Sequence, residues 1–216
     1  MNDPRDARPD GEAPAASTGA SRTVLQEVDH RVKNNLQLIA SMILLQSRRT
    51  TDPAARHALK TVLERVTAVS TVHRRLFQDD PLSFEAADFL RDLTSDMAAA
   101  AGRDDLQIGL ELDRVTMPAA SAAAFALVAN ELLGNALKHG FPAGRAGRVA
   151  VSLADRGGVC VFSVADDGVG AAGGSPGFGS AIVKLLCQQL HAELQVSDAG
   201  PGVRATVTIP VGPAGG

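Results

Sequence analysis

Two long stretches with helical periodicity restrict the fold of this chain more than any other feature of its sequence. In the first, the apolar side chains fall within one quarter of an ideal helix at about 100° per residue; they are Leu25, Val28, Val32, Leu36, Ile39 and Ile43. The second stretch has the same spacing of three and four, in Leu59, Val62, Val66, Val69, Val72 and Leu76. Thr51-Asp52-Pro53 lies between them and is typical of a turn with proline at the first position of a helix. The pattern predicts one helix to about residue 48 and a second over 53–77, forming an antiparallel hairpin.

A lone hairpin of this kind leaves much of each apolar stripe exposed to water. Pairing two hairpins into a four-helix bundle buries both stripes. We therefore expect a homodimer whose interface is residues 22–78. Packing of the hairpin onto the rest of the same chain is the alternative.

The opposite face of the first helix is polar and centres on His30. Lys33, Asn34 and Gln37 follow at three, four and seven residues, so they share this face. An imidazole with a reference pKa of about 6.5 is a competent nucleophile at neutral pH. His30 is thus a candidate reactive residue, with an ordinary solvated helix face as the alternative.

Composition excludes several classes of function. The 216 residues carry a net charge of −3 and no long Lys/Arg run, which argues against a nucleic-acid partner. No apolar run approaches the roughly 20 residues that cross a bilayer, and the first residues lack the apolar segment of a signal peptide. We expect no membrane insertion and a cytoplasmic location, with Cys160 and Cys187 as reduced core residues.

The rest of the chain predicts a second domain of mixed structure. Residues 1–21 are rich in Pro, Asp, Ala, Ser and Gly, as in a disordered tail, and 79–82 is typical of a linker. Residues 83–211 contain helical patterns at 86–101, 118–139 and 178–190, and strand patterns at 82–84, 106–112, 148–153, 159–165, 193–197 and 204–209; residues 212–216 form a short tail. The order predicts an α+β protein: the helical hairpin, then an α/β sandwich with helices on one face of a mixed sheet.

One predicted helix of this domain carries polar residues at chemically useful spacing. Glu131, Asn135 and Lys138 are separated by four and three residues and share a helical face. A carboxylate, an amide and an ammonium group together suit a hydrated Mg²⁺ and the phosphates that it bridges. A surface with ordinary salt bridges is the alternative.

A glycine-rich loop follows the strand at 159–165. Asp166-Asp167-Gly168-Val169-Gly170 begins the loop, and Gly177 and Gly179 end it at the start of a helix. Glycines allow a backbone to approach a ligand closely, and a helix N-terminus favours anions. The loop is therefore a candidate nucleotide lid.

Taken together, these motifs resemble a known superfamily. N-E-L-L-G-N-A-L-K-H, D-D-G-V-G, G-F-G-S-A-I-V and G-V-R-A-T-V-T-I-P are similar to the N, G1 and G2 boxes and the last strand of the Bergerat-type ATPases, which include gyrase, heat-shock chaperones, mismatch-repair ATPases and histidine kinases. H-R-V-K-N-N-L-Q resembles the phosphoacceptor box of the histidine kinases with an H-R-x-K-N signature. The resemblance covers roughly residues 22–210.

The resemblance implies a role for each matching residue. His30 would be phosphorylated, Asn135 would bind Mg²⁺ and Glu131 would be the acidic residue beside the metal. The resemblance also implies how ATP would be held. Lys138 and His139 would approach the phosphates, and Asp166 would accept a hydrogen bond from the adenine amino group. Gly168 and Gly170 would shape the pocket wall, Gly177 and Gly179 would line the triphosphate channel, and Thr206 would support the adenine end. Arg31 stands where the commonest histidine kinases have an acid after the acceptor, so Glu27 is the candidate base for His30.

The implied function is that of a soluble histidine kinase of a two-component system. It would use Mg-ATP to phosphorylate His30 and pass the phosphoryl group to an aspartate of a response regulator receiver domain. Only about twenty polar residues precede the first helix, so we expect the signal to come from a separate sensory partner, with entry through the tail or through the bundle itself as the alternatives. The alternatives are a phosphorelay histidine phosphotransferase with a weak or silent ATP-binding domain, and a serine kinase of the anti-sigma type.

Overall fold

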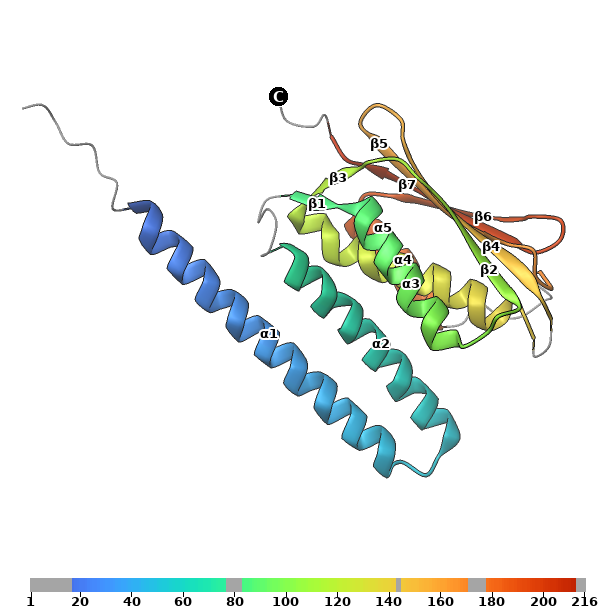
Figure 1. Ribbon diagram of the computed structural model, residues 1–216, viewed down its shortest axis with the longest axis horizontal. Helices are drawn as coiled ribbons and strands as arrows, with labels where there is room; N and C mark the ends of the chain where they lie inside the picture. The colour runs from blue at the N-terminus through green and yellow to red at the C-terminus, as the bar shows by residue number, and fades with distance from the viewer. Residues whose placement is uncertain (1–16, 77–82, 143–144, 171–177, 213–216) are drawn as a thin grey trace, which may run out of the picture.

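The computed structural model describes residues 17–76, 83–142, 145–170 and 178–212. Within these ranges the side chains of residues 17–30, 33, 72–76 and 178–180 are not described. A helical hairpin lies beside an α/β sandwich, with the second helix of the hairpin against the helices of the sandwich (Figure 1). The predicted linker at 79–82 and most of the predicted glycine loop lie outside the described residues.

The hairpin consists of α1, Ser17–Arg49, and α2, Pro53–Leu76. The turn forms as predicted, since Asp52 Oδ1 accepts a hydrogen bond from the Ala54 N–H at 3.0 Å at the start of α2. The helix α1 begins within the segment predicted as a disordered tail. The last helix-breaking residue before Ser17 is Pro14, and the residues that follow are small and compatible with a helix.

The predicted apolar stripe of α1 is only partly covered within one chain. Val32, Leu36 and Ile43 are half-buried, whereas Ile39 is 45% exposed. Asn34 is exposed as the sequence predicts, and so is Gln37. A lone hairpin is expected to leave part of the stripe in contact with water, so the exposure of Ile39 leaves its predicted place in a dimer core untested.

The sandwich has a five-stranded mixed sheet covered on one face by three helices (Figure 1). The helices are α3, Ala86–Ala101; α4, Ala119–His139; and α5, Phe178–Gln189. The strands are β2, Leu106–Leu112; β4, Gly147–Asp155; β5, Val159–Asp166; β6, Glu193–Asp198; and β7, Val203–Pro210. Their order is β2-β4-β5-β7-β6, in which only β2 and β4 pair in parallel. The predicted fold class is confirmed.

A second, two-stranded sheet pairs β1, Ser83–Glu85, with β3, Thr116–Pro118. Strand β1 lies close to the strand predicted at 82–84, whereas β3 was not predicted. Three residues are too few to show an alternating pattern, so β3 depends on its pairing with β1. This pair places Phe84 and Met117 in the core.

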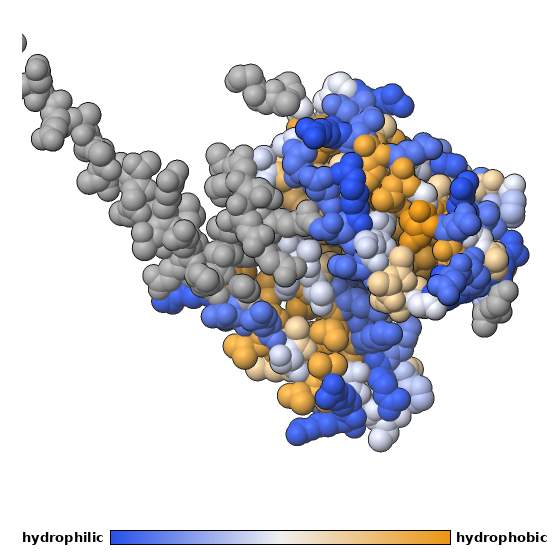
Figure 2. Space-filling model, viewed as in Figure 1, coloured by the Kyte–Doolittle hydropathy of each residue, from blue (hydrophilic) through white to orange (hydrophobic). Residues whose placement is uncertain are grey.

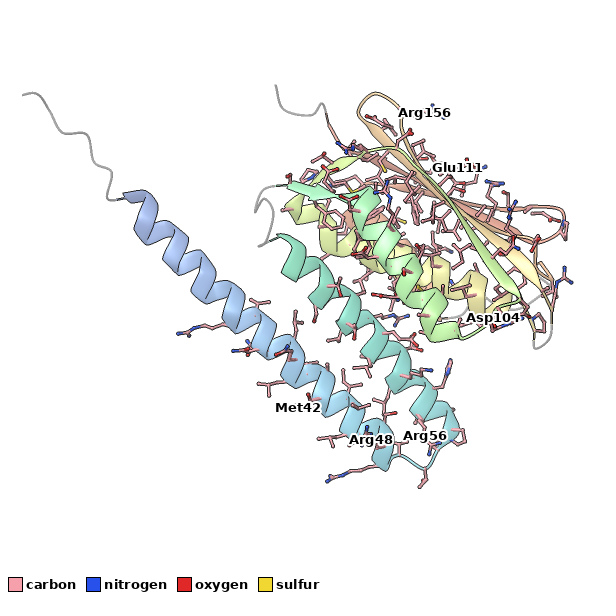
Figure 3. The ribbon with its side chains drawn as sticks, viewed as in Figure 1. Met42, Arg48, Arg56, Asp104, Glu111 and Arg156 are labelled. Carbon is pink, nitrogen blue, oxygen red and sulfur yellow. The ribbon has the colours of Figure 1, made fainter. Side chains whose placement is uncertain are left out.

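The core of the sandwich is built around four phenylalanines between the helices and the sheet. Phe125 on α4 is fully buried, and its ring centroid lies 5.4 Å from that of Phe162 on β5. Phe84 and Phe89 lie on its other side at 6.3 and 6.4 Å. Edge-to-face aromatic packing of this kind joins the helical layer to the sheet. Polar side chains, including the labelled Glu111, lie along the sheet on the side away from the helices (Figure 3).

Both cysteines are free and buried, as predicted. Burial raises the pKa of the Cys160 thiol to about 12 and also raises the pKa of Cys187. A raised pKa keeps a thiol protonated and unreactive at neutral pH. Both residues therefore act as small apolar core residues.

Helix α4 is the one helix of the described residues that is long and apolar enough to span a membrane by length and composition. However, 61% of its apolar window is buried within the protein. Its hydrophobicity is accounted for by its place at the centre of the sandwich, between α3, α5 and the sheet.

Candidate functional site

The C-terminal half of α4 presents two polar faces to different surroundings. Asn135 and His139 line a cavity between α4 and the sheet. Glu131 and Lys138 instead face α2 of the hairpin, where both form ion pairs. The predicted common face of Glu131, Asn135 and Lys138 is thus divided between a cavity and an interdomain contact.

The cavity has a volume of about 290 Å³. This volume is close to the lower end of the roughly 300–1,000 Å³ typical of small-molecule sites. Its wall is mainly apolar and consists of Leu132, Ala136, Val164, Val183, Leu194, Val196, Val203 and Ala205. Four residues at the polar rim complete it: Asn135, His139, Asp166 and Gly170, with Gly140 beside them. An apolar slot with a few polar groups suits a flat heterocycle that carries a polar edge.

Asp166 provides the buried polar group of the cavity. Its side chain is 8% exposed, and Oδ1 accepts a hydrogen bond from the Gly168 N–H at 3.0 Å. Among the described residues no hydrogen bond to its Oδ2 is formed. A buried carboxylate oxygen without a partner is costly, so Oδ2 is suited to accept a hydrogen bond from a ligand.

Three glycines allow the backbone to close around Asp166. A Cβ on Gly168 would lie 2.2 Å from the Gly140 carbonyl oxygen, and a Cβ on Gly202 would lie 1.8 Å from that of Asp166. Gly202 also has φ +97°, a conformation that favours glycine. Gly168 and Gly140 are further joined by the hydrogen bond from the Val169 N–H to the Gly140 oxygen, at 2.9 Å.

Two arginines support this turn from behind. Arg145 Nη2 donates to the backbone oxygens of Asp167 and Gly168, at 3.0 and 3.3 Å. Arg103 donates to the Phe141 and Arg145 oxygens while its guanidinium pairs with Asp105. The turn that holds Asp166 is therefore fixed to both the end of α4 and the start of β2.

Thr206 does not line the cavity. Strand β7 contributes Val203 and Ala205, whereas Thr206 lies on the outer face of the sheet, where its hydroxyl donates to Ser163 Oγ at 3.4 Å. The position of Thr206 therefore does not support its predicted contact at the adenine end, and Ala205 lines the cavity in its place. The alternation of Ala205, Val207 and Ile209 as the apolar positions was the available signal.

Several predicted residues cannot be placed. Glu27 and His30 lie on α1, but their side chains lie outside the described side chains; Gly179 lies in the first turn of α5, where its surroundings are not described. Gly177 lies outside the described residues altogether.

The contact between α2 and α4 contains residues that the sequence analysis did not single out. Arg65 donates from Nε and Nη2 to the two carboxylate oxygens of Glu131, at 2.6 and 2.8 Å. Glu64 accepts a hydrogen bond from Lys138 Nζ at 2.6 Å. The hydrogen bond to Glu131 raises the pKa of Arg65 above its usual value. No local pattern indicates such partners, which lie 66 and 74 residues apart in the chain.

Comparison with known proteins assigns both parts of the chain. Residues 27–101 match a family profile described as histidine kinase, and this match includes His30. Residues 120–213 match a profile described as histidine kinase-, DNA gyrase B-, and HSP90-like ATPase. The chain belongs to the histidine kinase family. The predicted resemblance is thereby confirmed.

Individual relatives of the chain are also histidine kinases. The histidine kinase chain is 31% identical over 199 residues to the sensor histidine kinase PdtaS of Mycobacterium tuberculosis, covering 87% of this chain and 39% of PdtaS. It is 30% identical over 213 residues to the blue-light-activated histidine kinase 2 of Erythrobacter litoralis, covering 93% of this chain and 60% of that protein. It thus spans less than two thirds of the length of these relatives.

A solved structure shows the same fold. The histidine kinase domain of the Erythrobacter litoralis EL346 blue-light activated histidine kinase superposes with a TM-score of 0.65 at 28% identity. The match covers 88% of this chain and 92% of that domain. The hairpin and sandwich are therefore the two domains of a histidine kinase.

The ATPase domain implies ATP as the ligand of the cavity, and the residues present fit a nucleotide. Asp166 Oδ2 is a partnerless acceptor for an amino group, and the wall is apolar. Asn135 is exposed at the rim and has an amide oxygen suited to Mg²⁺. The described residues contain no cluster of three or more His, Cys, Asp or Glu side chains that could hold a metal ion.

Proposed function

We propose that this chain is the kinase core of a two-component system. It would transfer the γ-phosphoryl group of Mg-ATP to His30 and then to an aspartate of a response regulator receiver domain. The observation that carries the proposal is the buried Asp166 carboxylate at the apolar cavity, on the same chain as a matched phosphoacceptor segment. The ATPase domain would supply the nucleotide site, and the hairpin would supply His30 as the phosphoryl acceptor.

The chemistry assigned to His30 is a direct displacement. A nitrogen of its neutral imidazole would attack the γ-phosphorus, and the bond from this phosphorus to the bridging oxygen would break, releasing ADP. In the second step a carboxylate oxygen of the regulator would attack the phosphorus, and the phosphorus–nitrogen bond would break to restore the imidazole. Bound Mg²⁺ would offset the phosphate charge, with Asn135 as its ligand from this chain.

Incubation with γ-labelled ATP tests the proposal directly. We expect acid-labile, base-stable label on the wild type and none above background on His30→Gln. Asn135→Ala should be labelled at least about a hundredfold more slowly, because the charge of the phosphates is no longer offset in the transition state.

Three outcomes would contradict the proposal. Label that survives His30→Gln would show a different acceptor, and acid-stable label on an added partner would indicate a serine kinase. Absence of ATP or ADP binding by calorimetry would favour the phosphorelay phosphotransferase with a silent ATP-binding domain.

We also propose that the chain is a homodimer through the hairpin. The support is an apolar strip on the face of α1 turned away from α2, in which Leu38, Met42 and Leu45 are 57, 65 and 56% exposed. Apolar residues gather along this part of the hairpin in Figure 2, and Met42 is labelled in Figure 3. A second hairpin would cover this strip in a four-helix bundle.

Met42→Glu should weaken this dimer. A charge placed in an apolar interface loses hydration without gaining a partner, so the dissociation constant should rise at least about tenfold. Light scattering coupled to size exclusion over a dilution series would measure the change. Ala99→Glu, on the exposed side of α3, should leave the mass distribution as in the wild type. An unchanged dissociation constant for Met42→Glu would place the interface elsewhere.

We also propose a cellular location for the protein. We place the protein in the cytoplasm, because ATP is available there and two free thiols suit a reducing compartment.

A further inference from the structure

The docking of the hairpin on the ATPase domain depends on two ion pairs between α2 and α4. Neighbouring residues of α2, Glu64 and Arg65, hold Lys138 and Glu131, which lie two helical turns apart on α4. The charges alternate, so each helix carries one acid and one base at the contact. Such an arrangement specifies one register of the two helices.

The two pairs differ in burial. The side chains of Arg65 and Glu131 are 12 and 7% exposed, whereas those of Lys138 and Glu64 are 42 and 33% exposed. Exposed ion pairs contribute little to stability, but a buried charge that loses its partner is strongly unfavourable. Arg65 and Glu131 are therefore the dominant pair, and Glu131 cannot remain in this environment without Arg65.

Apolar packing at the same contact is incomplete. A cavity of about 590 Å³ lies between α2, α3 and α4, with Leu63, Phe89 and Met97 among its lining residues. This cavity is open to solvent, so the apolar atoms that line it contact water instead of the facing helix and contribute less to the docking than packed atoms would. The charged contacts thus carry a larger share of the docking than they would in a close-packed interface.

The ion pairs also occupy two groups to which the family resemblance assigns a role at the nucleotide phosphates and the metal. Both carboxylate oxygens of Glu131 accept from Arg65, and the Lys138 ammonium donates to Glu64. In addition, α2 lies between α1, which carries His30, and the ATPase domain (Figure 1). The docked arrangement is therefore unsuited to transfer within this chain.

We propose that Arg65, assisted by Glu64, is a positioning residue that acts on phosphotransfer through Glu131, by holding the ATPase domain against α2 in a resting arrangement. Release of the two ion pairs frees Glu131 and Lys138 for the nucleotide and lets the ATPase domain leave α2. This inference rests on the proposed function, since it assigns a control to the same transfer. It predicts that weakening the ion pairs accelerates autophosphorylation.

The test compares Arg65→Met with the wild type in the full chain. Methionine keeps much of the side-chain length and removes the charge, so Glu131 can be satisfied only by opening the contact to water. We expect autophosphorylation from labelled ATP to be faster by roughly fivefold or more. Arg65→Lys should restore slow labelling in part, and Glu64→Gln should give a smaller increase because its pair is exposed. Arg156→Met, on the remote turn labelled in Figure 3, should label as the wild type does.

Small-angle scattering of the same proteins measures docking without any need for activity. Arg65→Met should have a larger radius of gyration than the wild type, and the double variant Arg65→Met/Glu131→Met should return to the wild-type value because no buried charge remains. A radius of gyration of Arg65→Met equal to that of the wild type would overturn the inference. So would labelling rates of Arg65→Met and Glu64→Gln that are both unchanged or slower than the wild-type rate. If the wild type takes up no label, the proposed function fails, whereas the scattering comparison still decides the docking.

Discussion

Substitution of Phe125 by alanine is expected to lower the free energy of unfolding by about 3–5 kcal/mol. Phe125 is fully buried, and its ring packs against those of Phe84, Phe89 and Phe162. Truncation removes the apolar contact and leaves a cavity at the point where α4 meets the sheet. Urea denaturation monitored by circular dichroism would measure the loss.

Leu110→Ala is the matched control for this prediction. Leu110 lies on β2 and is 40% exposed, so its truncation should change the free energy of unfolding by about 0.5 kcal/mol or less. A loss below about 1 kcal/mol for Phe125→Ala would show that the aromatic cluster does not hold the two layers together.

The largest effect on ligand binding is expected for Asp166→Ala. The substitution removes the partnerless acceptor at the cavity and the hydrogen bond to the Gly168 N–H. Hydrogen bonds to charged groups contribute about 1.5–3 kcal/mol each, so we expect the dissociation constant for ATP to rise about a hundredfold or more. Isothermal titration calorimetry with ATP and ADP is the measurement.

Two variants separate the nucleotide contact from the turn. Asp155 also accepts a hydrogen bond from the N–H two residues on, at 3.0 Å, but its turn is remote from the cavity; Asp155→Ala should bind ATP normally. Asp166→Asn keeps one acceptor oxygen and should lose about tenfold in affinity. Wild-type affinity in Asp166→Ala would move the nucleotide site away from this cavity.

Strong local signals explain why so many boundaries agree with the sequence prediction. The strand β2 was predicted from its alternating pattern and α3 from its helical pattern, and both have the predicted bounds. Helix α3 ends where Gly102 adopts the left-handed conformation, which only the absence of a Cβ makes easy. Asp166 was assigned through the resemblance to the Bergerat-type ATPases, which rests on several short motifs in their usual order rather than on the D-D-G-V-G turn alone.

The sequence by itself determined the order of most elements, the family, and four of the residues at the cavity, Asn135, His139, Asp166 and Gly170, because each follows from near-neighbour periodicity or from a short motif. Only the tertiary structure decided that Glu131 and Lys138 turn away from that cavity to Arg65 and Glu64. It also decided that Ala205 rather than Thr206 lines the cavity. Helical spacing assigns residues to a face, but the partner of that face depends on how distant segments pack, and this information is absent from any local pattern.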